Sequence, residues 1–180
     1  MRVPWSAVFG NERPVEVEIG PGRGETILAL AAASPDRNFF GIERKAGAAA
    51  AIAAAAARRA LANVRLVGGD ARCIVARLVP DASVAAYHVY FPDPWPKTGH
   101  RHRRLMTPDF AAAVARTLVP GGAVHVASDL PALTADLHTR LAAAGLVPHP
   151  TATAPPRPPT KFERRYATTG THYTCLVRPR

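Results

Sequence analysis

The sequence predicts a doubly wound α/β fold, in which helices cover both faces of a mostly parallel β-sheet. Two observations predict it: short apolar runs alternate with helical segments along the chain, and the first apolar run ends in a glycine-rich loop. Parallel neighbouring strands need helical crossovers, and such sheets bind ligands at the carboxyl ends of their strands. With 180 residues, we expect a single domain over 1–180 that includes a short lead-in over 1–14.

Six apolar runs predict the strands, because they are short and rich in β-branched or aromatic residues. The first five, expected to be parallel, are 15–19, 39–42, 64–67, 85–91 and 123–127. The sixth run, 172–178, predicts a strand of a C-terminal edge hairpin. The proline and two glycines at 120–122 predict a turn that leads into the fifth strand.

Helices are predicted between these strands, where alanine, leucine and charged residues dominate. The expected helices span 24–34, 46–62, 71–79, 107–119 and 130–145. Pro35 ends the first of them, and Thr107 is expected to cap the helix that begins at Pro108. The segment 147–165 is proline-rich and basic, and we expect its proline-rich part, 147–160, to run extended.

The charge balance indicates a polyanionic partner. Lys and Arg total 23 against 13 Asp and Glu, which gives a formal net charge of +10. The chain contains no apolar run long enough to cross a bilayer and no signal peptide, so we expect no membrane partner and a cytoplasmic location. Cys73 and Cys175 have no metal-like spacing, and His100 and His102 lie among arginines, so no metal site is predicted.

A ligand loop is predicted after the first strand. Gly20, Gly22 and Gly24 let the backbone turn sharply and approach a ligand as the next helix begins. Glu43 follows about twenty residues later at a strand end, where a carboxylate can bind ribose hydroxyls, and Asp70 follows the third strand. The alternatives are a structural turn without a ligand and two solvated turn residues.

The charge around this loop favours a cationic cofactor. Glu18 precedes the loop and Glu25 follows it, whereas a diphosphate prefers helix amides with no carboxylate beside them. S-adenosylmethionine carries a sulfonium, an ammonium and an adenosine, so it fits better than NAD. An NAD-dependent oxidoreductase is the weaker alternative, because the third glycine also comes one residue too early for the dinucleotide fingerprint.

The segment FPDPWPK follows the fourth strand. Its alternating prolines, Pro92, Pro94 and Pro96, restrict the backbone and are expected to fix the directions of Asp93 and Trp95 over the pocket. For Trp95 two interpretations remain open: stacking on an RNA base, or a buried wedge under the proline turn.

Basic residues follow this segment and recur near the C-terminus. We expect them to contact RNA phosphates, and solubilising surface charge is the alternative. They are Lys97, Arg101, Arg103, Arg104, Arg157, Lys161, Arg164 and Arg165.

Several stretches together resemble the tRNA (guanine-N7)-methyltransferase family. They are WSAVFGNERPVEVEIGPGRGE, GIER, FPDPWPKTGHRHRRL, SDL and RPPTKFERR, and the similarity covers nearly the whole chain. The resemblance implies the Rossmann-like sheet of the class I S-adenosylmethionine-dependent methyltransferases. It also implies methyl transfer from S-adenosylmethionine to N7 of a guanine in tRNA, guanosine 46 of the variable loop, forming 7-methylguanosine. The alternatives are another RNA site, a small molecule, or a non-catalytic RNA-binding paralogue.

Site residues follow from the same resemblance. It implies that Asp93 is the catalytic residue and that the cofactor site comprises Glu18, Gly20, Gly22, Gly24, Glu43, Asp70, Ala71 and Asp93. It implies substrate contacts at Lys97, Asp129, Thr160, Lys161, Phe162 and Glu163. Family members carry a longer N-terminal extension before the counterpart of Trp5, so we expect an intact active site with a reduced RNA-binding surface. The oligomeric state stays open.

Overall fold

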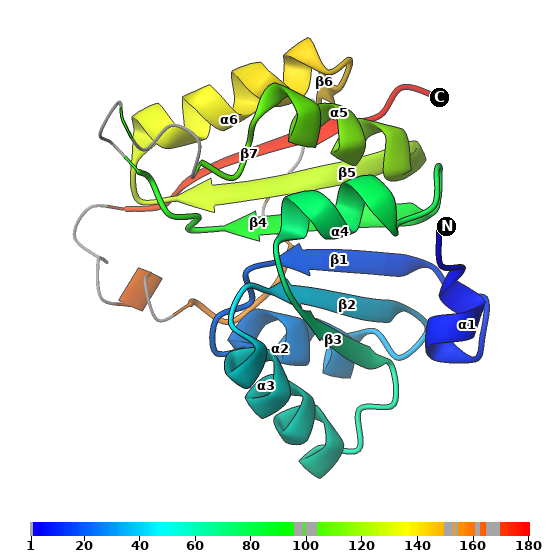
Figure 1. The fold of residues 1–180 in the computed structure, drawn as a ribbon. Coiled ribbons are helices and arrows are strands. Elements are labelled where there is room, and N and C mark those ends of the chain that lie inside the picture. The colour runs from blue at the N-terminus through cyan, green and yellow to red at the C-terminus, as the bar shows by residue number, and fades with distance from the viewer. Residues whose placement is uncertain are drawn as a thin grey trace.

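The computed structural model describes residues 2–95, 99, 104–149, 153, 155–160, 163–164 and 170–180. These residues form a seven-stranded sheet with the order β3-β2-β1-β4-β5-β7-β6 (Figure 1). Strands β1 to β5 pair in parallel, and β7 runs antiparallel to β5 and β6. The strands are β1 Val15–Ile19, β2 Asn38–Glu43, β3 Val64–Gly68, β4 Val84–Tyr90, β5 Leu118–Ser128, β6 Val147–Pro148 and β7 His172–Val177. The doubly wound α/β prediction is confirmed.

The first helix precedes β1, and the helices that follow it connect the strands. The helices are α1 Trp5–Phe9, α2 Glu25–Ala33, α3 Ala46–Arg58, α4 Ala71–Arg77, α5 Pro108–Thr117 and α6 Pro131–Ala143. The hydroxyl of Thr107 accepts a hydrogen bond from the backbone N–H of Phe110 at 3.2 Å, which confirms the predicted cap of α5. Helix α1 was not predicted from the sequence. The indole of Trp5 in this helix donates a hydrogen bond to the Ser83 hydroxyl at 3.1 Å, and the Trp5 ring packs against Phe40.

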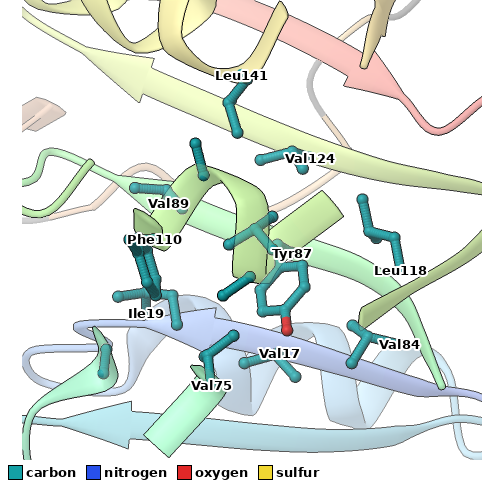
Figure 2. Close-up of a cluster of buried hydrophobic side chains, with 14 of the residues drawn as sticks. Val17, Ile19, Val75, Val84, Tyr87, Val89, Phe110, Leu118, Val124 and Leu141 are labelled. Carbon is teal, nitrogen blue, oxygen red and sulfur yellow. The ribbon is translucent and has the colours of Figure 1, made fainter. Parts of the chain in front are cut away.

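The two faces of the sheet bury different side chains, because successive residues of a strand point to opposite faces. Val17, Tyr87 and Val124 lie in the core between the sheet and the helices α4, α5 and α6 (Figure 2). Tyr87 is fully buried, and its hydroxyl satisfies its hydrogen bonding with Thr117 at 2.7 Å. On the other face Phe39 packs with residues of α2 and α3 in a second, smaller core.

One expectation differs from the structure. The residues 120–122 were predicted to form a turn before the fifth strand, but β5 already begins at Leu118 and continues through them. They form a bulge, because the pairing with β4 passes from Leu118 to Ala123 while the partner strand advances only from Val84 to Ala86. The expected C-terminal edge hairpin is confirmed, because β7 pairs antiparallel with the two-residue β6, which is the outermost strand of the sheet.

The second face of the central strands is polar where α2 and α3 do not cover it. His88 on β4 contacts Glu16 on β1 at 2.7 Å and stacks on His125 of β5, whose ring bonds to the Tyr173 hydroxyl at 2.7 Å. The connection from β6 to β7 reaches this face, because the Tyr173 hydroxyl donates to the carbonyl of Thr153 at 3.1 Å. Burial lowers the pKa of His125 to about 4, which favours the neutral imidazole at pH 7.

Candidate active site

The glycine loop lies between β1 and α2 and has the strained backbone that glycine permits. Gly20, Gly22 and Gly24 adopt φ of 69°, 59° and 78°, in the left-handed region. The amide of Gly20 donates to the carbonyl of Ile42 at 2.9 Å, which ties the loop to the end of β2. A Cβ on Gly24 would lie 2.6 Å from Cγ2 of Ile52, so the loop also packs closely against α3.

Glu18 lies at the end of β1 and is buried, with 5% of its surface exposed. Burial raises the pKa of its carboxyl to about 8, although the charge of Arg157 and the backbone N–H of Ile27 favour the ionised form. Its Oε2 has no hydrogen-bond partner among the described residues. A buried carboxyl oxygen of this kind is suited to a ligand that brings a cation or a hydrogen-bond donor.

Glu43 and Asp70 lie at the ends of the next two strands. The carboxylate of Glu43 accepts hydrogen bonds from the amide of Gly22 at 3.2 Å and from the amide of Lys45 at 3.1 Å, so it contacts the glycine loop directly. Asp70 caps α4 by accepting from the amide of Arg72 at 2.9 Å. The side-chain hydrogen bond from Arg72 lowers the pKa of Asp70. Ala71, the first residue of α4, is buried beside it.

Asp93 lies on the exposed segment that follows β4. Phe91 and Trp95 on either side have positive φ of 50° and 40°, so the predicted stiff turn is a strained one. The guanidinium of Arg104 donates to the carbonyl of Trp95 at 3.3 Å and joins this segment to the chain before α5. Residues from the segment, the chain before α5 and α6 line a small pocket: Pro92, Asp93, Arg104, Leu105, Met106, Leu133, Asp136 and Leu137.

Asp129 directly follows β5, and its carboxylate accepts from the Ser128 hydroxyl at 3.4 Å. Five of the 13 acidic residues therefore lie at or just beyond the carboxyl ends of β1 to β5: Glu18, Glu43, Asp70, Asp93 and Asp129. Because the parallel strands all end at one edge, this edge is acidic in a chain whose net charge is +10. The local charge suits a cationic ligand, and the overall charge suits a polyanion.

The connection between β6 and β7 contains Thr160 and Glu163, two of the predicted substrate contacts. The amide of Thr160 donates to Glu163 Oε2 at 2.6 Å, and the amide of Glu163 donates to the Thr160 hydroxyl at 3.2 Å. This reciprocal pair is a capping box, and the spacing T-x-x-E is the sequence signal that could have predicted it. Arg164 donates to Glu25 at 2.6 Å, so this connection reaches the first turn of α2 beside the glycine loop.

The surroundings of Arg157 differ from those expected from the sequence. Arg157 was grouped with the phosphate contacts, but only 5% of its side chain is exposed, and its guanidinium lies over the ring of Tyr90 and pairs with Glu163. Tyr90, at the end of β4, was not singled out. Several predicted contacts lie outside the described residues: Lys97, Arg101, Arg103, Lys161, Phe162 and Arg165.

The described part of the chain contains neither a metal-binding cluster nor a membrane-spanning helix. There, no group of three or more His, Cys, Asp or Glu side chains is placed to hold a metal ion. No helix among the described residues is both long and apolar enough to cross a membrane. Cys73 is exposed, Cys175 is buried, and both are free thiols.

The sheet order and the solved structures that superpose on this chain define the fold class. The fold is the Rossmann-like fold of the class I S-adenosylmethionine-dependent methyltransferases. The 16S rRNA methyltransferase KamB superposes with a TM-score of 0.68 at 20% identity, covering 98% of this chain and 93% of that chain. The [4+2]-cyclase SpnF superposes equally well, with a TM-score of 0.68 at 16% identity over 94% of this chain and 76% of its own, so the fold alone does not assign a reaction.

Sequence similarity narrows the class to a family. Residues 12–176 match the family described as "Putative methyltransferase". A tRNA (guanine-N(7)-)-methyltransferase of Streptomyces coelicolor is 39% identical over 171 residues, 89% of this chain and 62% of the relative. One of Nitrosomonas eutropha is 34% identical, covering 91% of this chain and 75% of the relative. The chain belongs to the tRNA (guanine-N7)-methyltransferase family. It spans less than two thirds of the length of the Streptomyces relative.

Proposed function

We propose that the protein transfers a methyl group from S-adenosylmethionine to N7 of a guanine in tRNA, forming 7-methylguanosine. Guanosine 46 of the variable loop is the proposed target, and the cytoplasm the proposed location. The observation that carries the proposal is the acidic strand edge, with the buried and unpartnered Oε2 of Glu18, in a basic chain of this family. A cationic cofactor fits the edge, and a polyanionic substrate fits the overall charge.

The proposed cofactor contacts follow from the geometry of the strand ends. Glu18, which is buried, is proposed to bind the ammonium group. Glu43, which accepts a hydrogen bond from the amide of Gly22, is proposed to accept hydrogen bonds from the ribose hydroxyls. Asp70 and Ala71, at the start of α4, are proposed to contact the adenine. When bound, S-adenosylmethionine supplies a sulfonium-bound methyl group for displacement.

The chain's own contribution to the chemistry is orientation and charge. Guanine N7 has an exposed lone pair, so no general base is needed, and the reaction depends on in-line placement and on stabilising positive charge on the purine. Asp93 is proposed to accept hydrogen bonds from the guanine edge and to offset that charge. Its exposed position after β4 leaves the carboxylate accessible to a base.

The substrate side is proposed to consist of Asp129, Thr160 and Glu163, with Lys97, Lys161 and Phe162. Phosphate contacts are proposed for Arg104 and Arg164, and for Arg101, Arg103 and Arg165. Each phosphate contact releases counterions, so tRNA affinity should fall steeply as salt rises. Exposure of half of the Arg164 side chain supports its role.

A substrate comparison tests the proposed function. The protein is incubated with labelled S-adenosylmethionine and either unmodified tRNA, ribosomal RNA, or a small-molecule pool. Label is expected in tRNA alone. Label in ribosomal RNA or in small molecules, with none in tRNA, would contradict the assignment of the substrate, and no label in any pool alongside tight tRNA binding would indicate a non-catalytic RNA-binding protein.

A further inference from the structure

Arg157 belongs to the connection between β6 and β7, yet its side chain is buried against the sheet. Only 5% of the side chain is exposed, and its guanidinium carbon lies 4.2 Å from the centroid of the Tyr90 ring. A cation over an aromatic face is attracted by the ring, more strongly when water is excluded. Arg157 is therefore anchored at the carboxyl end of β4, the strand that leads to Asp93.

The same guanidinium holds the proposed substrate-contact turn. Its two terminal nitrogens donate to Oε2 and Oε1 of Glu163 at 2.6 Å and 2.8 Å, a bidentate pair. Oε2 of Glu163 also accepts from the amide of Thr160 at 2.6 Å. The Glu163 carboxylate thus bonds to both the Arg157 guanidinium and the Thr160 amide. The position of the Thr160 and Glu163 backbone therefore depends on where Arg157 lies.

Arg157 also acts on the proposed cofactor side. Burial raises the pKa of Glu18 to about 8, and the positive charge of Arg157 opposes that rise. Burial is the main cause that raises the pKa of the Tyr90 hydroxyl. The charge of Arg157 lowers this pKa, and the charge of Glu18 raises it. Glu18 on β1 and Tyr90 on β4 belong to adjacent strands, and Arg157 packs on the Tyr90 ring at the end of β4.

We propose that Arg157 is a positioning residue that fixes the substrate-contact turn of Thr160 and Glu163 relative to the cofactor pocket at Glu18. The inference rests on the proposed function for the identity of the two ligands. It gives Arg157 a role inside the protein in place of the phosphate contact suggested by its charge. Loss of the side chain would release the turn and remove the cation beside Glu18 together.

Two variants separate these effects. Arg157→Met removes the charge and the hydrogen bonds. Arg157→Lys keeps a cation but cannot form the two parallel bonds of the planar guanidinium. Arg116→Met is the matched control, because Arg116 is a partly buried arginine that pairs with Asp81 before β4, at the opposite edge of the sheet.

The readouts are the KM and kcat for unmodified tRNA and, without RNA, the affinity for S-adenosylmethionine between pH 6 and 9. Both Arg157 variants are expected to raise the KM for tRNA on the order of tenfold or more relative to the control, the usual scale for breaking a buried charge pair. Arg157→Met is also expected to move the pH dependence of cofactor binding upward, because Glu18 loses the cation that favours its ionised form. Arg157→Lys is expected to keep the original pH dependence.

Thermal unfolding of each variant shows whether it folds, and the Lys variant keeps the test decisive if the Met variant does not. A KM for tRNA in Arg157→Lys equal to that of the control overturns the proposal, as does an unchanged pH dependence of cofactor binding in a folded Arg157→Met protein. A failure of the proposed function looks different, because the unaltered protein would then bind no S-adenosylmethionine or transfer no methyl group to tRNA.

Discussion

Glu16 on β1 and His88 on β4 contact each other beneath the active-site edge, with Glu16 Oε2 and His88 Nε2 2.7 Å apart. The His88 side chain is 2% exposed, and Arg37 donates to the other Glu16 oxygen at 2.9 Å. Burial alone would raise the pKa of Glu16, but His88 and then Arg37 outweigh it and hold the pKa below its ordinary value. The strands that carry Glu18 and Tyr90 are thus joined by a side-chain hydrogen bond.

This contact predicts a loss of stability at acid pH. A carboxylate whose pKa is lowered in the folded state contributes stability above its ordinary pKa of 4.5, and that contribution is lost as the pH falls through the folded value. Glu16→Gln should therefore lower the free energy of unfolding at pH 7 by about 1–3 kcal/mol, and the difference should shrink below pH 4.5. Urea unfolding across this range checks it, with the exposed Glu12→Gln as control. A difference independent of pH would contradict it.

Glu18 predicts the opposite trend. Its folded pKa of about 8 exceeds the ordinary 4.5, so the folded protein retains a proton that the unfolded chain loses, and stability falls as the pH rises between these values. Glu18→Gln should remove about 2 kcal/mol of that fall between pH 6 and 8. Urea unfolding of both proteins measures it, and parallel curves would count against a buried, protonated Glu18.

Binding of S-adenosylmethionine should depend on the proton that the Glu18 carboxyl carries. A cation binds the ionised carboxylate, so affinity for S-adenosylmethionine should rise as the pH approaches and passes about 8, with release of a proton at pH 7. Calorimetry in two buffers of different ionisation enthalpy detects that proton. Glu18→Gln should show weak binding without the pH dependence, and a variant that binds normally would exclude Glu18 from the cofactor site.

Gly24 and Gly20 separate packing from backbone strain in the glycine loop. Both have positive φ, but a Cβ on Gly24 would meet Ile52 at 2.6 Å, whereas none of the described atoms lies within 4 Å of one on Gly20. Gly20→Ala should cost about 1–2 kcal/mol from strain alone, and Gly24→Ala about 1–3 kcal/mol more, because Ile52 or the loop must move. Urea unfolding measures both, and equal losses would contradict the packing argument.

Asp93 should affect catalysis without affecting the fold. It is exposed and belongs to no helix or strand, so Asp93→Ala should change the free energy of unfolding by less than about 0.5 kcal/mol. Methyl transfer to tRNA should fall about a hundredfold or more if its carboxylate orients the base and offsets charge. Steady-state rates and a urea titration test the two statements, and near-native turnover would remove Asp93 from the catalytic role.

Local sequence patterns were sufficient for the framework of the site. The strands that end before Gly20, Asp70 and Asp93 are marked by apolar runs, and the glycines must lie where φ is positive. Parallel pairing then places all the strand ends at one edge. These features depend on residues that are close together in the sequence, so they could be read directly from it.

The parts that could not be predicted depend on distant contacts. An arginine in a proline-rich segment normally indicates a solvated surface, and the burial of Arg157 depends on a long connection that reaches Tyr90, which is far from it in the sequence. The continuous β5 depends on pairing with β7: the amide of Gly121 donates to the carbonyl of Arg178 at 2.9 Å. In both cases the contact joins residues that are far apart in the sequence, and no local sequence pattern around Arg157 or Gly121 indicates it.

Nucleoside analysis tests the central claim most directly. Unmodified tRNA is incubated with the protein and labelled S-adenosylmethionine, digested to nucleosides and separated, with Asp93→Ala as the matched control. The predicted result is label in 7-methylguanosine with the unaltered protein and a rate reduced about a hundredfold or more with the variant. Label in any other nucleoside, or no label in tRNA from a protein that binds the cofactor, would contradict the account.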